Sequence, residues 1–240
     1  MKTTAISHRL IASIATILFC IFFTPQAHSQ ANGEPDLIQK IDAAVRARDA
    51  GIESYTVNEH YAVFRGKDEE HPAAEMRVKT TYQKKVGKTY TILEQSGSDL
   101  MRKEVLGTIL DHEKEMSKPD TRMTAVITSA NYDMQIKGAE ARDGRNSIAL
   151  SLKPKRISPF LFNGTIWADS QDGSIIALDG VAAKSASMIT GPAQIARHYA
   201  LIDGFPMAIH ASAVSNSWLL GRTVIKIDYT GYEIHPVTAR

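Results

Sequence analysis

The chain has 240 residues, of which 43% are hydrophobic and 22% charged, with 15 glycines, 9 prolines and one cysteine. This composition is typical of a globular protein, and it excludes a disordered chain, a collagen-like repeat and a disulfide scaffold. The formal net charge is +2, and it becomes zero without the leader described next, because 26 basic and 26 acidic residues remain. Nucleic-acid binding usually requires a basic face, so we expect no nucleic-acid partner.

The first 29 residues have the parts of a signal peptide. Two positive charges precede a mainly apolar stretch over residues 10–23, and a small-x-small site follows at Ala27–Ser29. This stretch is shorter than the about 20 residues that span a bilayer. We therefore expect cleavage after Ser29, with Ala31 as the alternative, export to the periplasm, and a single mature domain over residues 30–240.

The only cysteine, Cys20, lies within this leader. The predicted mature chain thus has no cysteine, which excludes disulfides, thiol catalysis and cysteine zinc sites. Such a chain must be held together by burial and backbone pairing, so we expect one continuous core.

The predicted elements begin with a helix. Asp36 is a candidate N-cap with Gln39 three residues later, and apolar residues recur at helical spacing up to Gly51. The spacing of the apolar residues then changes to two, as between Met76 and Tyr82, where apolar and polar residues alternate. Such patterns predict about eleven strands, near residues 54–65, 75–86, 89–95, 123–128, 130–137, 147–153, 162–169, 174–180, 196–203, 206–213 and 222–230.

Turn-forming residues separate many of these strands. They lie at Asp143–Gly144, Gln171–Ser174, Asp203–Gly204 and Ser215–Ser217. Short turns between neighbouring strands indicate hairpins, so we expect a mostly antiparallel meander.

A second amphipathic helix is predicted over residues 98–116. Its apolar side would carry Leu100, Met101, Val105, Leu106, Ile109 and Leu110, and its charged side Arg102, Lys103, Glu104, Asp111, Glu113 and Lys114. The run Asp111–Glu115 suggests acid–base chemistry, but we interpret it as a solvated charged face.

About eleven strands, each with one apolar face, form a larger apolar sheet surface than a few helices can cover. Open sheets beyond about 10 strands curl or close. We therefore expect an α+β, mainly β fold, in which a single antiparallel sheet of about eleven strands is curled into a strongly bent or partly closed barrel. Two or three helices would cover its mouth or concave face. The enclosed space is either filled by side chains or open to an apolar ligand.

Three short motifs resemble those of the LolA/LolB lipoprotein-carrier superfamily, which includes the lipid-binding domain of RseB-type sensors. They are the strand–turn–strand from Phe162 to Ile176, which contains Trp167-Ala168-Asp169 and Asp172-Gly173, then Ile202–Pro206 and Ile227–Tyr232. The resemblance implies a half-barrel with helices as a lid over a cavity for acyl chains, and no catalysis. No residue here aligns with the single arginine that locks the lid of the carrier.

Large, adaptable side chains in the strands and the apolar side of the second helix are the candidate cargo contacts. Ordinary core packing is the alternative for each of them. The candidates are Met76, Tyr82, Tyr90, Val105, Leu106, Ile109, Leu110, Trp167, Met207 and Ile225.

The common sequence-local signatures of enzymes are missing from the sequence. We therefore expect no enzyme, no cofactor and no metal site, since the six histidines of the mature chain are scattered. The first hypothesis is a monomeric periplasmic carrier of lipid or lipoprotein acyl chains, with an inner- or outer-membrane protein as a further candidate partner. The alternatives are an envelope-stress sensor or interaction module that binds a partner's apolar segment, and a hydrolase without a recognisable motif.

Overall fold

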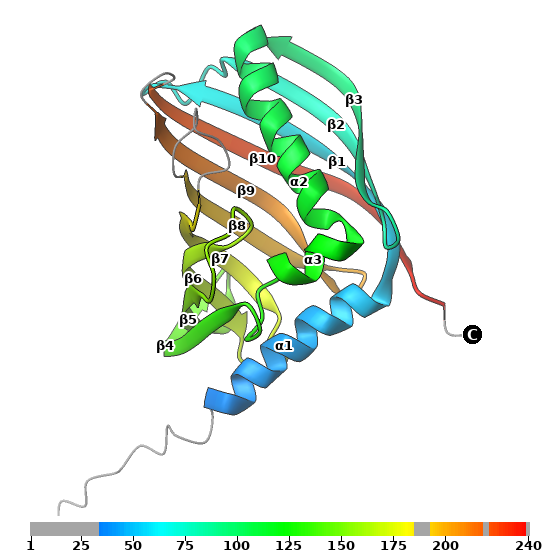
Figure 1. The fold of residues 1–240 in the computed structure, drawn as a ribbon, viewed down its shortest axis with the longest axis vertical. Helices are drawn as coiled ribbons and strands as arrows, with labels where there is room; N and C mark the ends of the chain where they lie inside the picture. Colours follow the sequence, from blue (N-terminus) through cyan, green and yellow to red (C-terminus); the bar gives the residue numbers. More distant parts are fainter. Residues whose placement is uncertain (1–33, 185–192, 218–220, 239–240) are drawn as a thin grey trace, which may run out of the picture. The chain divides into compact units, whose positions relative to one another are not determined.

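The computed structural model describes residues 34–184, 193–217 and 221–238 (Figure 1). The predicted leader lies outside these residues. The helices are α1 (Glu34–Gly51), η1 (Met101–Gly107, a π-helix), α2 (Thr108–Ser117) and α3 (Pro119–Ala125). The strands are β1 (Ile52–Arg65), β2 (Ala74–Gln83), β3 (Gly87–Gly97), β4 (Tyr132–Arg142), β5 (Arg145–Pro154), β6 (Phe162–Asp169), β7 (Ile175–Ala182), β8 (Ala193–Ile202), β9 (Phe205–Ser217) and β10 (Gly221–Pro236).

Within the described residues, the strands form one antiparallel sheet of ten strands in the order β3-β2-β1-β10-β9-β8-β7-β6-β5-β4. Strands adjacent in sequence are adjacent in the sheet from β1 to β3 and from β4 to β10, and β10 pairs with β1. The edge strands β3 and β4 do not pair with each other, so the sheet does not close into a barrel. The mainly β, antiparallel fold predicted from the sequence is confirmed, with one strand fewer.

The missing strand is the one predicted over residues 123–128, where α3 continues to Ala125 and residues 126–128 belong to neither a helix nor a strand. Pro119 is the first residue of α3, a position where the fixed φ of proline favours a helix. The amide of Asn131 donates to the carbonyls of Met123 at 3.0 Å and Val126 at 2.8 Å, next to the end of the helix. The predicted turn at Ser215–Ser217 is also wrong, because β9 continues to Ser217.

The two predicted helices are present with shifted limits. The first begins at Glu34, so Asp36 lies inside its first turn and pairs with Lys40 at 2.9 Å instead of capping it. The second is divided into η1 and α2. Leu100, predicted on the apolar side, is 50% exposed.

The helices pack against two parts of the sheet through separate apolar clusters. Met101, Val105, Leu106 and Leu110 are buried with residues of β1, β2, β9 and β10. Leu37 and Ile41 of α1 are buried with residues of β5, β6 and β7. Figure 1 shows α2 in front of the strands around β1 and β10, and α1 along the lower end of the sheet.

Gly173, in the turn between β6 and β7, permits the close approach of α1. Its φ is +75°, in the left-handed region that glycine tolerates. A Cβ there would lie 2.5 Å from the carbonyl carbon of Lys40, so only glycine fits against this part of the helix. The Asp172-Gly173 turn therefore fixes α1 at one end of the sheet.

Candidate functional site

A cavity of about 470 Å³ lies between the helices and the sheet. This volume lies within the range of about 300–1,000 Å³ that is usual for ligand sites. Its wall on the helix side includes Ala44, Val45 and Arg48 of α1 and Val105, Ile109, His112, Glu113 and Met116 of η1 and α2. Its wall on the sheet side includes Tyr55, Tyr82, Leu178, Ile195, Arg197, Met207, Ile225, Ile227 and Tyr229.

Small side chains on β9 help to explain why this space is open. Ala208, Ala211 and Ala213 all line the cavity, at places where larger side chains would extend toward the helices. Protein interiors are otherwise packed to near-crystalline density, so small residues opposite a helix leave room. Ala213 pairs with Ile195 on β8 and Ile225 on β10, which also line the cavity.

Five of the ten predicted cargo contacts line this cavity, namely Tyr82, Val105, Ile109, Met207 and Ile225. Four others, Met76, Tyr90, Leu106 and Leu110, belong to the apolar cluster beneath η1 and α2 or pack against it. Trp167 is outside both groups. It packs with Ala149 and Ala177, and the Arg142 guanidinium lies 4.2 Å from its ring centroid.

A buried ion-pair cluster lies in the cavity wall. One carboxylate oxygen of Glu113 accepts a hydrogen bond from Lys88 Nζ of β3 at 2.6 Å, and the other from Arg197 Nη2 of β8 at 2.8 Å. The side chains of Glu113, Lys88 and Arg197 are 9%, 14% and 27% exposed. One carboxylate thus joins α2 to two strands that are far apart in the sheet order.

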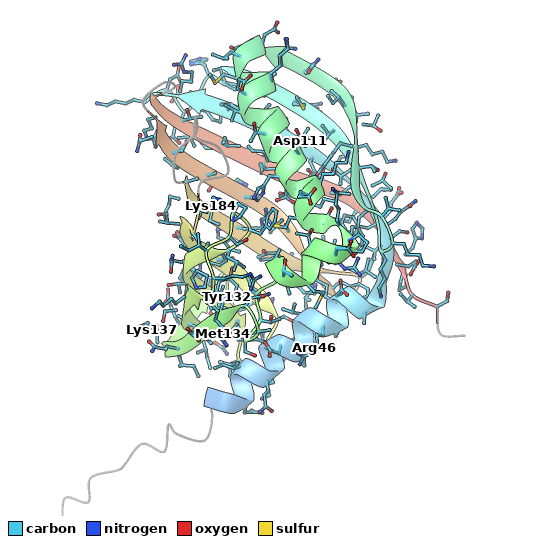
Figure 2. All side chains as sticks on the ribbon, viewed as in Figure 1. Arg46, Asp111, Tyr132, Met134, Lys137 and Lys184 are labelled. Carbon is cyan, nitrogen blue, oxygen red and sulfur yellow. The ribbon has the colours of Figure 1, made fainter. Side chains whose placement is uncertain are left out.

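The prediction of a solvated face at Asp111–Glu115 is therefore wrong for Glu113. Asp111, labelled on α2 in Figure 2, is exposed, and so are Lys114 and Glu115. Glu113 follows Ile109 by four residues and Leu110 by three, so helical periodicity places it on the side that faces the sheet. That spacing is the signal in the sequence that could have identified it.

The two cations also determine the ionisation of Glu113. Burial by itself would raise the pKa of the carboxyl, but attraction by Lys88 and Arg197 and their hydrogen bonds outweigh burial, so its pKa lies well below the ordinary value. Burial would lower the pKa of Lys88, but the charge of Glu113 raises it well above its ordinary value. All three groups are therefore charged at neutral pH.

This lowered pKa predicts a specific acid sensitivity. A carboxyl whose pKa falls on folding stabilises the protein above its ordinary pKa of 4.5, and the stabilisation is lost as the pH falls toward the folded value. Below pH about 4.5, the free energy of unfolding of the wild type should fall more steeply than that of E113Q, by about 1.4 kcal/mol per pH unit. Urea unfolding at pH 7, 4.5 and 3.5 measures this difference, and parallel pH curves would contradict it.

Glu59 of β1 is another acid in the cavity wall. It is 2% exposed and accepts a hydrogen bond from the hydroxyl of Tyr61. Burial and the charge of Glu59 raise the pKa of Tyr61 well above its ordinary value. Tyr61 therefore keeps its proton and remains a hydrogen-bond donor to Glu59.

The histidines of the described residues lie apart or in pairs with single carboxylates. His198 and His210, opposite each other on β8 and β9, contact Asp143 and Asp228 respectively, each at 2.8 Å. Within residues 34–184, 193–217 and 221–238, no group of three or more histidine, cysteine or acidic side chains is arranged to hold a metal ion. No helix in these ranges is long and apolar enough to cross a membrane.

The comparisons with known proteins show the fold. No family model and no curated protein matches the chain. Among solved structures, this chain is similar to a putative outer membrane lipoprotein-sorting protein domain from Vibrio parahaemolyticus. The two sequences are 12% identical, the match covers 85% of this chain and 94% of that chain, and the TM-score is 0.50.

Two further solved structures match with lower TM-scores. A LolA superfamily protein from Nitrosomonas europaea has 10% identity, covers 85% of this chain and 94% of its own, and has a TM-score of 0.46. The matched chain in the complex of MucA and MucB from Pseudomonas aeruginosa has 8% identity and a TM-score of 0.27. The match covers 83% of this chain and 94% of that chain. The chain has the fold of the lipoprotein-sorting protein domain from Vibrio parahaemolyticus, as its motifs led us to expect.

Proposed function

We propose that this protein is a periplasmic carrier or binding protein for lipidated or other apolar cargo, and that it has no catalytic role. The observation that carries the proposal is the cavity of about 470 Å³ between the lid helices and the sheet. Burial of an acyl chain there would contribute about 0.8 kcal/mol for each methylene group. The predicted signal peptide and the net charge of zero for the mature chain also support an exported carrier, because such a chain lacks electrostatic attraction to anionic membranes.

The cargo contacts that we propose are the predicted residues that line the cavity: Tyr82, Val105, Ile109, Met207 and Ile225. Tyr82 and Ile225 come from the sheet, whereas Val105 comes from η1 and Ile109 from α2. An acyl chain between these residues would be removed from water on both sides.

Native mass spectrometry of the protein purified from the periplasm tests this function. We expect lipid adducts in the native spectrum, and uptake of a fluorescent fatty-acid probe after the lipid has been removed. A clean mass of the chain alone, together with no uptake of the probe, would contradict the proposal. A pull-down that returns one stoichiometric protein partner and no lipid would instead favour an interaction module.

A further inference from the structure

The cavity wall contains a ready-made pair of carboxylate-binding cations. Lys88 and Arg197 line the cavity, and each donates to a different oxygen of Glu113. Lysine and arginine form strong, charge-assisted hydrogen bonds with carboxylates, and these bonds are strongest where water is excluded. A second carboxylate that enters the cavity would therefore find the same two donors.

Beyond η1, whose Met101, Val105 and Leu106 are buried against the sheet, the segment that carries Glu113 has few apolar contacts with the sheet. The buried residues of α2 are Leu110 and Glu113, and α3 has none. Polar contacts hold the rest of the segment: the backbone N–H of Lys88 donates to Ser117 Oγ at 2.7 Å, and Arg122 pairs with Asp49 of α1 at 2.7 Å. The two ion pairs of Glu113 are therefore a main part of what holds α2 to the sheet, and a ligand that replaced Glu113 on the two cations would allow α2 to move.

Movement of α2 would leave two cations without their counter-ion. Glu113 would leave with the helix, whereas Lys88 and Arg197 belong to the sheet. Partly buried cations without a partner are strongly unfavourable. A ligand with a carboxylate would restore both pairs, and a ligand with a neutral head would not.

We propose that Lys88 and Arg197 bind the carboxylate head of a single-chain amphiphile, such as a fatty acid, whose hydrocarbon chain lies in the cavity. Glu113 is the internal carboxylate that competes with this head. The proposal rests on the proposed function, because it assigns the class of cargo for the same cavity. It also gives a reason for a charged cluster in a mainly apolar site: the cluster selects cargo by the charge of its head.

The test compares dodecanoate with dodecanol, which differ in the head group. R197Q removes one donor, so we expect it to weaken dodecanoate binding by about 10- to 100-fold, the usual range for a hydrogen bond to a charged group. E113Q removes the competitor, so it should strengthen dodecanoate binding by about tenfold or more. Both changes should alter dodecanol binding much less than dodecanoate binding, because a neutral hydroxyl forms no ion pair with the two cations. Isothermal titration calorimetry of the exported protein measures both ligands.

The matched control is R145Q. Arg145 pairs with Asp169 at 2.7 Å and is 30% exposed, close to the 27% of Arg197, but it does not line the cavity. We expect R145Q to bind dodecanoate like the wild type.

The outcomes separate this proposal from the proposed function. If both ligands bind and the variants affect them equally, the carboxylate site is overturned and an apolar carrier remains. If neither ligand binds to any variant, both proposals are overturned.

A second measurement uses the wild type and needs no variant. The ¹³C carboxyl signal of labelled, bound dodecanoate should show an ionised head at pH values where the free acid is protonated. Protonation at the same pH as the free acid would overturn the proposal.

Discussion

Replacement of Glu113 by alanine is expected to lower the free energy of unfolding by about 3–5 kcal/mol at pH 7, because it leaves two partly buried cations without a partner. Lys88 is 14% exposed and Arg197 27%, so water compensates little for the lost carboxylate. The expected loss is a large part of the stability of a typical domain, which is about 5–15 kcal/mol. Urea unfolding followed by circular dichroism measures it.

Glu115 provides the control on the same helix. It pairs with Lys118, and both side chains are about half exposed, at 50% and 47%. Exposed pairs of this kind contribute about 0–1 kcal/mol, so E115A should have little effect. Equal, small effects of E113A and E115A would contradict the burial of Glu113.

A triple variant distinguishes the ion pairs from ordinary packing. Replacement of Lys88, Glu113 and Arg197 together by Met, Leu and Met removes all three charges and retains apolar volume. Such replacements of buried ionic clusters are often neutral or stabilising by about 1–4 kcal/mol, so the triple variant should recover most of the stability that E113A loses. Failure to recover would indicate that the stability lost in E113A comes from packing and not from unpaired charge.

The fold could be predicted because its signals are local. The alternation from Met76 to Tyr82 places Met76, Val78, Thr80 and Tyr82 in the core, and all four are buried. Hairpin turns are local as well, as at Asp203-Gly204, where both residues have positive φ. Such patterns need only neighbouring residues, so ten of the eleven predicted strands are present.

The cavity could be predicted only in part, because it depends on contacts between distant residues. Lys88 lies 25 residues before Glu113, and Arg197 lies 84 residues after it. No local pattern joins these three positions, so the charged cluster was missed. Trp167 illustrates a second limit: alternation tells which residues share a side of a strand, but the sequence does not tell which side the helices cover.

A larger side chain in the cavity wall should reduce the binding of apolar cargo. Replacement of Ala213 by phenylalanine is expected to weaken the binding of a fatty-acid probe by more than about tenfold, since displacement of two or three methylene groups costs about 2 kcal/mol. Ala213 lines the cavity between Ile195 and Ile225, so the added ring would extend into the space proposed for the acyl chain. The new side chain enters existing space, and the free energy of unfolding should therefore change by less than about 1.5 kcal/mol.

The control is Ala141 of β4, an exposed alanine outside the cavity wall. The A141F variant carries the same added ring on the same sheet, and it should bind the probe like the wild type. Fluorescence titration gives the affinity, and circular dichroism with a thermal melt shows that each variant is folded. If A213F is folded and still binds the probe as tightly as A141F does, the acyl chain does not lie in this cavity. If A213F alone loses the probe, the space beside β9 is where apolar cargo binds, because the two variants differ only in where the ring is placed.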